Sequence, residues 1–393
     1  MTPANPTTPS ERIVALDVLR GFALYGVFLT NAYVSARPME AAMSPPAPGS
    51  GGADVLAWML FDGLLVMKFV ALFSVLFGIG LVLQAERAEA KGLRFGRLYL
   101  KRLGVLAVFG VLHGCLLFEG DILLVYSLVG LVLFWFRRCS AATLVKVGAA
   151  PLVVGIGLSL LWVALGEDSW GEKLSEFDAR ADEARRSGGI ADLLAVRPVE
   201  FVSWLAVSSF VSFNWRVVAL FFFGAAVMKA GWTRAEHGAL QRKVAVIGLV
   251  AGGMLELGAA AAAYWAAPGP TGLRLGLALA DETASLLLSA GYFCGVLVAV
   301  HSGWCRALQA GLAAVGRLAL TNYILQSVVM NVVFFGFGFG MFDRISRVGV
   351  LGLMSALFGL QVALSVLWLL RFEQGPLEWL WRRLTYPRRT GEG

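Results

Sequence analysis

Charged residues are scarce in this 393-residue chain. Only 15% of the residues are Asp, Glu, Lys or Arg, whereas a soluble domain carries about 25%. Hydrophobic residues make up 58% of the chain, and its mean hydropathy is +0.73. The shortage of charge and the many long apolar runs exclude an ordinary soluble protein and predict a polytopic membrane protein. The net charge of +7 therefore does not indicate nucleic-acid binding, because basic residues of membrane proteins collect in cytoplasmic loops.

Histidine and cysteine are also rare. The chain has three histidines and four cysteines, and no two cysteines form a CxxC pair. Cys115 and Cys294 fall inside apolar runs, where cysteine packs as a small hydrophobic residue. Because these residues lack the spacing of a metal site, we expect neither a bound metal nor a tightly bound cofactor.

The apolar runs predict an all-α transmembrane bundle of about ten spanning helices over residues 13–370. Residues 1–12 form a short polar tail, which we expect to be flexible. We expect the first span to be retained rather than cleaved as a signal peptide, because charges interrupt its apolar region. The third and fourth spans are short and joined by FEGD, which predicts a tight helical hairpin. The predicted spans are 13–34, 60–83, 103–118, 121–136, 144–165, 206–229, 244–266, 281–300, 312–336 and 349–370.

Basic residues are distributed unevenly among the loops. They gather between spans two and three, after spans four and six, and in the C-terminal tail, all on one side if the helices alternate. The positive-inside rule then places both termini in the cytoplasm, with the chain crossing the membrane many times.

Three segments outside the spans have their own character. Residues 35–57 are rich in Pro, Gly and small residues and predict an irregular extracytoplasmic loop. Residues 166–200 form a long charged loop in which Leu174, Phe177, Ala181 and Ala184 recur at helical spacing, predicting a surface helix. That helix is either a lid over a site or a solvated connector. Residues 371–393 predict a short amphipathic helix at the cytoplasmic interface, followed by a tail.

Two opposite charges begin the first span. A charged side chain at mid-bilayer costs roughly 3 kcal/mol on insertion scales, so it requires a partner, a water-filled cavity or a function. Asp17 and Arg20 are three residues apart and share one helix face. They can neutralise each other, which leaves open both a structural pairing and a direct role in binding.

His113 lies near the end of the third span, shortly before Glu119 and Asp121. A histidine beside a carboxylate is a common general-base arrangement, because the carboxylate fixes the tautomer and supports the imidazolium. The alternative is a histidine that only packs against a neighbouring helix. Gly110 and Gly114 form a GxxxG step, which predicts close helix contact at this point.

Further polar residues interrupt the apolar spans. They include Glu256, Arg317 and Asn331, and Asn322 and Gln326 are four apart on one helix face. Together they predict a polar interior that contains a substrate cavity. The residues that we expect to line it are Asn31, Lys68, Arg216, Asn322 and Gln326.

Three stretches resemble a known family: LDVLRGFALYGVFLTN, RLGVLAVFGVLHGCLLFEGDILLVYSLVGLVL, and GRLALTNYILQSVV with the later GPLEWLWRRLTY. They are similar to the YeiB-like membrane proteins that share domain of unknown function 418. The resemblance spans nearly the whole chain and implies a multi-pass fold in a bacterial cytoplasmic (inner) membrane.

The opening LDVLRG also resembles membrane acyltransferases of the heparan-glucosaminide acetyltransferase and sugar O-acyltransferase types. This resemblance implies transfer of an acyl group from cytosolic acyl-CoA, with Arg20, oriented by Asp17, meeting the donor phosphates. The O-acyltransferases carry a catalytic His eleven residues after the Arg, where this chain has Asn31. An amide has no titratable nitrogen, so His113 with Asp121 or Glu119 becomes the candidate base.

Three functions follow as hypotheses. The first is an acyltransferase-like enzyme that acts on a small or lipid-like acceptor. The second is a transporter or exporter of a small amphipathic molecule, which internal repeats would favour, but LDVLRG has no second copy. The third is a membrane scaffold or sensor that uses residues 166–200. The partners expected are the bilayer and a small-molecule or lipid substrate, not nucleic acid, and a homo-oligomer remains open.

Overall fold

The computed structural model describes residues 13–386 except 48, 91, 93–94, 166–170, 211 and 267–268, with backbone alone at 171–177, 210 and 266. The predicted tail over residues 1–12 and the final residues 387–393 lie outside the described residues. Every regular element in the described ranges is a helix, as the composition predicted. The helices before residue 166 are α1 (Val14–Ser35), α2 (Met39–Met43), α3 (Gly52–Leu60), the π-helix Phe61–Leu65, α4 (Lys68–Ala90), α5 (Phe95–Leu116), α6 (Leu123–Trp135) and α7 (Ala141–Leu165).

The second part of the chain is equally helical. Its first helix, α8, confirms the surface helix predicted within 166–200. The helices are α8 (Gly171–Ser187), α9 (Ile190–Phe210), α10 (Ser212–Lys229), the 3-10 helix Ala235–His237, α11 (Gly238–Ile247), the π-helix Gly248–Gly252, α12 (Gly253–Ala266), α13 (Thr271–His301), α14 (Arg306–Arg317), α15 (Ala319–Phe334), α16 (Arg347–Arg371) and α17 (Pro376–Thr385).

Within the described residues, seven helical stretches are long and apolar enough to cross a membrane, and up to nine if each bent pair counts as one span. The bent pairs are α9 with α10, at 70°, and α14 with α15, at 85°. The predicted span 121–136 corresponds to α6, which has 13 residues. At 1.5 Å per residue α6 is only about 20 Å long, so it falls short of a hydrocarbon core of about 30 Å.

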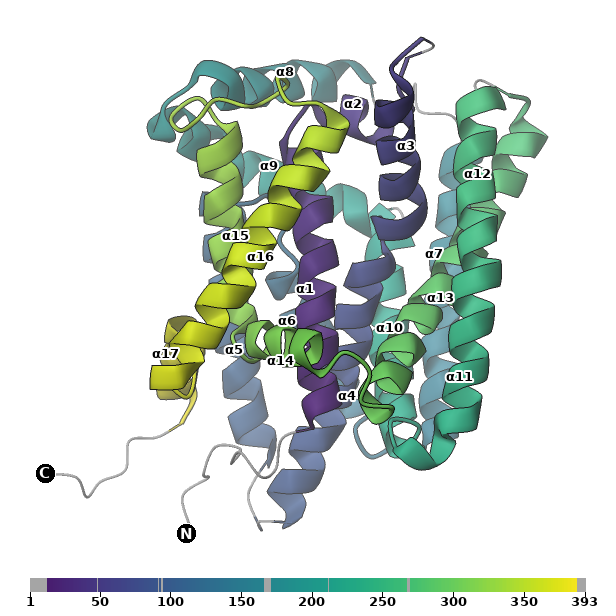
Figure 1. Cartoon of the computed structure of the whole chain (residues 1–393), viewed down its shortest axis with the longest axis vertical. Coiled ribbons are helices and arrows are strands. Elements are labelled where there is room, and N and C mark those ends of the chain that lie inside the picture. Colours follow the sequence, from purple (N-terminus) through teal and green to yellow (C-terminus); the bar gives the residue numbers. More distant parts are fainter. Residues whose placement is uncertain are drawn as a thin grey trace, which may run out of the picture.

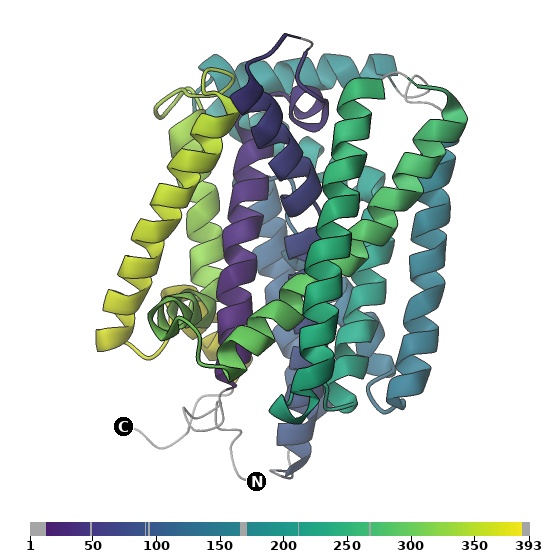
Figure 2. The same ribbon diagram turned by 45° about the vertical axis from the view of Figure 1, so that its right-hand side comes forward.

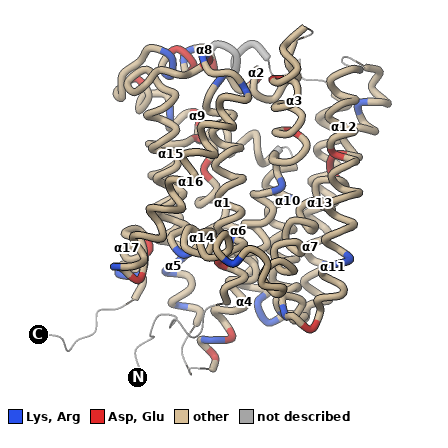
Figure 3. The backbone as a smooth tube through the Cα atoms, viewed as in Figure 1, with Lys and Arg blue, Asp and Glu red and all other residues tan. Residues whose placement is uncertain are grey.

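Figures 1 and 2 show the helices standing side by side, with α1 between the α4 and α16 regions. The first turn of α1 and the C-terminal helix α17 lie at the same end of the bundle, which we call the terminal end (Figure 1). Helix α8 crosses the opposite end, which we call the α8 end. Charged residues concentrate near these two ends, and a few lie at mid-height (Figure 3).

The start of α1 is held by a very close crossing with α14. A Cβ atom added to Gly21 would lie 1.9 Å from the carbonyl oxygen of Leu312, and one added to Gly316 would lie 1.9 Å from that of Asp17. Only glycine therefore allows the two backbones to approach this closely. The crossing places Asp17 and Arg20 beside the sharp bend between α14 and α15.

A second irregularity interrupts the helix pair α3–α4. After the π-helix Phe61–Leu65, Met67 adopts a positive φ of 65°, and α4 then begins at Lys68. The break frees backbone carbonyls that must find donors inside the bundle. The Tyr292 hydroxyl donates to the Leu64 carbonyl at 3.2 Å, and the Lys68 ammonium donates to the Asp62 carbonyl at 3.1 Å.

The α1–α14 crossing gives a direct test of the packing. Gly21→Ala forces the backbones apart, so we expect it to lower the free energy of unfolding by about 1–3 kcal/mol. The matched control is Gly104→Ala, where the added Cβ meets nothing within 4 Å and little change is expected. Thermal unfolding of the detergent-purified variants measures both, and equal melting temperatures would contradict the close crossing.

Candidate functional site

His113 is the centre of a buried chain of hydrogen bonds that joins three segments. Its Nδ1 lies 2.8 Å from Asp121 Oδ1, and its Nε2 lies 2.8 Å from the Ser327 hydroxyl oxygen. The histidine comes from α5, the aspartate from the segment before α6, and the serine from α15. All three side chains are buried. The expected pairing of His113 with Asp121 is therefore present in the structure, and Ser327 extends it.

The turn between α5 and α6 brings His113 and Asp121 together although they are eight residues apart. The amides of Leu117 and Phe118 both donate to the His113 carbonyl, at 2.9 and 3.0 Å, so the chain reverses at once. Asp121 Oδ2 then accepts the Leu124 amide at 2.9 Å, which caps the start of α6. One carboxyl group thus fixes both the new helix and the imidazole.

These contacts assign the direction of each hydrogen bond around His113. An ionised carboxylate only accepts hydrogen bonds, so His113 Nδ1–H donates to Asp121. Nε2 is then the acceptor, and the Ser327 hydroxyl donates to it. In this tautomer the histidine is placed to take a proton from Ser327 or from a hydroxyl in its position.

Two glycines of α5 make room for the histidine's surroundings. A Cβ on Gly110 would lie 2.3 Å from the Leu124 amide nitrogen, and a Cβ on Gly114 would lie 2.5 Å from the Phe201 ring. The close helix contact predicted from the GxxxG step is confirmed. It lets α6 approach α5 closely enough for Asp121 to reach His113.

A cavity of about 380 Å³ lies near these hydrogen bonds, and Ile122 and Tyr323 line it, whereas His113, Asp121 and Ser327 do not. It extends from the terminal end, where Ile13 and Tyr386 line it, to Ile122 and Tyr323 inside the bundle. Ile122 follows Asp121 in the sequence, and Tyr323 lies one turn before Ser327. The Tyr323 ring centroid is 4.8 Å from that of His113. Its buried hydroxyl makes no hydrogen bond of normal geometry within the described residues.

The cavity combines a charged mouth with apolar walls. Along α4 the lining runs from Phe73 to Arg87, a depth of about 21 Å at 1.5 Å per residue. The walls are mostly Leu and Phe side chains. Five arginines and three carboxylates also line the cavity. The arginines outnumber the carboxylates, which favours binding of an anion. They are Arg20, Arg87, Arg102, Arg317 and Arg382, with Asp17, Glu373 and Glu378.

Asp17 and Arg20 lie at this mouth and contact each other, as their spacing predicted. The Arg20 guanidinium is 2.6 Å from the Asp17 carboxylate, and about a third of the Arg20 side chain is exposed. The exposed part leaves donors available to a further acceptor in the cavity.

Helix α17 closes part of the mouth. Glu378 accepts the amides of Leu320 and Thr321, at 2.7 and 3.1 Å, and so caps the start of α15. The Trp381 indole donates to the Arg102 carbonyl at 3.1 Å, and the Arg102 guanidinium lies 4.5 Å from the centre of the Trp381 ring. The amphipathic helix predicted for the tail therefore contributes directly to the cavity wall.

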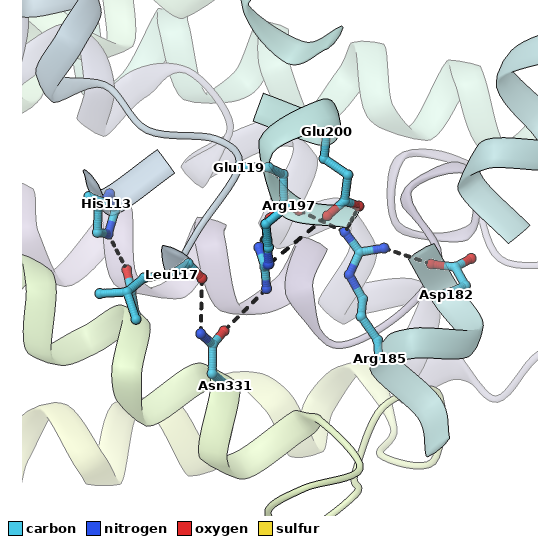
Figure 4. A network of polar contacts seen from close by, with 9 residues as sticks. His113, Leu117, Glu119, Asp182, Arg185, Arg197, Glu200 and Asn331 are labelled. Atoms are coloured by element: carbon cyan, nitrogen blue, oxygen red, sulfur yellow. Dashed lines mark hydrogen bonds and ion pairs between the residues drawn. The ribbon is translucent and has the colours of Figure 1, made fainter. Parts of the chain in front are cut away.

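Glu119 requires a correction, because it does not contact His113. It pairs instead with Arg197 and with Arg185, the latter at 3.0 Å. Figure 4 shows the network, in which Arg185 also meets Asp182 and Glu200, and Arg197 reaches Asn331. Burial by itself raises the pKa of Glu119, but Arg197 and Arg185 outweigh burial and bring that pKa below its ordinary value of 4.5.

The five residues expected to line a polar substrate cavity do not meet in one place. None of them lines the cavity described above. Lys68 forms a buried ion pair with Glu256 at 2.8 Å, and Arg216 pairs with Glu282 and donates to Ser285 at 3.0 Å. A charge in an apolar medium is stabilised best by a directly contacting partner, so these residues join helices instead of facing an open chamber.

The polar stripe of α15 is also occupied by helix contacts. Asn322 donates to Ser365 at 3.1 Å and Gln326 donates to Gln361 at 2.8 Å, both residues of α16. Asn31 is half-buried, more than two turns beyond Arg20 on α1. In the described part of the chain, no three His, Cys, Asp or Glu side chains come together as a metal site.

Ser327 is the residue that sequence reasoning missed. It is adjacent to Gln326, yet 214 positions separate it from His113. A lone serine in a membrane helix commonly bonds its own backbone, so only the packing of α15 against α5 reveals this partner.

Comparison with known proteins places the chain among relatives of similar length. The uncharacterized protein YeiB of Escherichia coli (strain K12) is 30% identical over 391 residues, covering 95% of this chain and 96% of YeiB. This chain belongs to the YeiB-like DUF418 family. The model for "Protein of unknown function (DUF418)" matches residues 227–388. The uncharacterized protein YxaH of Bacillus subtilis (strain 168) is 29% identical over 409 residues, covering 98% of the chain and 97% of YxaH. No solved structure matches the chain significantly.

The DUF418 match covers only one of the three residues that are hydrogen-bonded around His113. The matched part of this DUF418 protein includes α15 with Ser327 and Tyr323, and α17 at the cavity mouth. His113 and Asp121 precede the matched part, in the first half of the chain. The hydrogen bonds among Asp121, His113 and Ser327 therefore require both halves of the sequence, and the alignments with the relatives span both halves.

The Glu119 network predicts a pH dependence. Because the pKa of Glu119 is lower in the folded protein than its ordinary 4.5, its stabilising effect is present above pH 4.5 and is lost as the pH falls further. We expect the wild-type melting temperature to fall below that pH more steeply than that of Glu119→Gln. Parallel slopes for the two proteins would contradict this pairing.

The Lys68–Glu256 pair predicts a rescue by double substitution. Lys68→Met leaves a buried carboxylate without its partner, and breaking such a pair costs about 3–5 kcal/mol. The double variant Lys68→Met/Glu256→Met should lose less stability than Lys68→Met alone. Equilibrium unfolding in detergent measures Lys68→Met, Glu256→Met and the double variant, and additive losses would show that the two side chains do not interact.

Proposed function

We propose that this membrane protein is an acyltransferase that moves an acyl group from cytosolic acyl-CoA to a hydroxyl of a small or lipid-like acceptor. One observation carries the proposal. His113 lies between a carboxylate and a hydroxyl, with 2.8 Å contacts on both sides, and its ring lies 4.8 Å from that of Tyr323, which lines a cavity that also carries five arginines. A base, its orienting acid and a hydroxyl in this arrangement recur in enzymes that transfer acyl groups.

The donor enters through the mouth of the cavity. Its phosphates meet arginine side chains, Arg20 among them, because guanidinium groups bind phosphate oxygens in pairs of hydrogen bonds. The linear remainder of the donor lies along the apolar walls, which run about 21 Å along α4. The thioester carbon then reaches the inner end beside Tyr323, whose hydroxyl is positioned to donate to the thioester carbonyl oxygen.

This proposal fixes the orientation of the molecule. The terminal end faces the cytoplasm, where acyl-CoA is found, and the α8 end faces the other side of a bacterial cytoplasmic membrane. The concentration of basic residues in the loops of the terminal end supports this orientation.

Transport of a small amphipathic molecule is the second candidate, and one observation favours it. Helices α3 and α4 are interrupted inside the bundle next to the buried pair of Lys68 and Glu256. Interrupted helices with charged residues near mid-membrane are typical of transporters. This pair lies apart from the cavity lining, so variants can separate the two functions.

The deciding experiment measures acyl-CoA binding and release of free CoA by protein in lipid nanodiscs. Arg20→Ala should weaken donor binding in calorimetry by roughly 10-fold or more, the loss of a charged hydrogen bond. His113→Gln should bind donor normally but release CoA roughly 10²–10⁴-fold more slowly, the range for a general base.

The charge control is Arg234→Ala, because the Arg234 side chain is 72% exposed and lies outside the cavity lining. It should match the wild type in both assays. Failure of the folded wild type to bind acetyl-CoA, octanoyl-CoA or palmitoyl-CoA would reject the acyltransferase and favour transport.

A further inference from the structure

We infer that Ser327 is the nucleophile of the proposed reaction and carries the acyl group as a covalent ester between donor and acceptor. The inference rests on the proposed acyl transfer. It adds that the reaction proceeds in two displacements, so that the donor leaves before the acceptor is acylated.

The geometry around the serine favours a nucleophile over a merely structural hydroxyl. Serines in membrane helices usually satisfy their hydroxyl on a carbonyl of the preceding turn, as Ser289 does with the Ser285 carbonyl at 2.7 Å. Ser327 instead donates to the one ring nitrogen of His113 that is free to accept. That nitrogen accepts because the other one donates to Asp121.

The rigidity of this arrangement supports the same conclusion. Asp121 is held by the Leu124 amide, and His113 is held by Asp121. A catalytic base must keep its orientation without help from water. These contacts supply that orientation in a place where all three side chains are buried.

The position of Ser327 relative to the cavity completes the argument. Tyr323, one turn earlier on α15, lines the cavity, and its ring lies tilted beside that of His113. A thioester carbon at the inner end of the cavity therefore approaches α15 at the turn that carries Ser327. Ser327 itself does not line the cavity, so the proposed attack requires the Tyr323 ring to rotate aside, and that rotation also directs its hydroxyl at the developing oxyanion.

The first step is balanced without any oxidant or metal. Ser327 Oγ attacks the thioester carbon as its proton passes to His113 Nε2. The new C–O bond forms, the C–S bond breaks, and the protonated histidine returns the proton to the sulfur, releasing CoA with a free thiol. In the second step the acceptor hydroxyl attacks the acyl-serine, its proton passes to His113, and Ser327 regains it.

The test is isotope exchange in the absence of acceptor, with protein in nanodiscs and acetyl-CoA or palmitoyl-CoA as the probe. A covalent intermediate lets labelled free CoA enter the acyl-CoA pool, whereas direct transfer does not. We expect exchange in the wild type, and a loss of roughly 10³-fold in Ser327→Ala. Ser289→Ala is the matched control, a buried membrane serine outside the site that should exchange like the wild type.

A second measurement identifies the acylated atom. Mass spectrometry of acid-quenched protein should place the acyl group on the peptide that contains Ser327. Ser327→Cys should carry it as a thioester that neutral hydroxylamine removes, whereas the serine ester resists. This treatment also distinguishes acylation of the neighbouring Cys115, which would overturn the inference.

The outcomes separate the two proposals. Acyl transfer to an acceptor with release of CoA but without isotope exchange, or full transfer activity in Ser327→Ala, overturns the covalent role of Ser327 and leaves acyl transfer standing. Absence of both CoA release and donor binding rejects acyl transfer itself. Exchange lost in Ser327→Ala together with label on Ser327 establishes the intermediate.

Discussion

The absence of water from the bilayer core is the constraint on which the rest of this structure depends. A polar side chain placed there must find a protein partner, because no solvent can replace one. Lys68 therefore pairs with Glu256, Arg216 pairs with Glu282, and His113 lies between Asp121 and Ser327. Each contact joins elements that are distant in sequence, so the polar residues determine which helices become neighbours.

The same constraint distinguishes two kinds of buried polar contact in the molecule. The pairs formed by Lys68 and by Arg216 are enclosed by other helices and lie away from the cavity lining. His113, Asp121 and Ser327 are equally well paired, but their neighbours Ile122 and Tyr323 line a cavity that reaches the terminal end. A paired charge that is fully enclosed contributes to assembly of the bundle, whereas one beside an open volume is also accessible to a ligand.

Helix α8 and the Glu119 network connect the α8 end of the bundle with His113 and Ser327. Arg197 bonds Asn331, and Asn331 in turn donates to the Leu117 carbonyl at 3.0 Å (Figure 4). Leu117 follows α5 four residues after His113, and Asn331 lies one turn after Ser327 on α15. The network therefore holds together the two helices whose alignment sets the distance between His113 and Ser327.

Much of the architecture follows from the sequence alone. Twenty apolar residues in succession form a membrane helix because their backbone groups must bond within the segment, so the all-helical fold and its apolar segments were predictable. The pairing of Asp17 with Arg20 was equally local, because residues three apart share a helix face. The helix of the tail and the close contact at Gly110 and Gly114 followed from periodicity and residue size.

Contacts between distant segments were decided by the tertiary structure. Lys68, Arg216, Asn322 and Gln326 were expected to line a substrate cavity, but each bonds a residue of another helix, and helical periodicity does not state which helix supplies that partner. The choice of Asp121 over Glu119 depends on how the chain reverses after α5. Ser327 reaches His113 only because α15 packs against α5 across 214 positions of sequence. Sequence determines which side chains cannot remain alone in a bilayer, and packing determines which ones they meet.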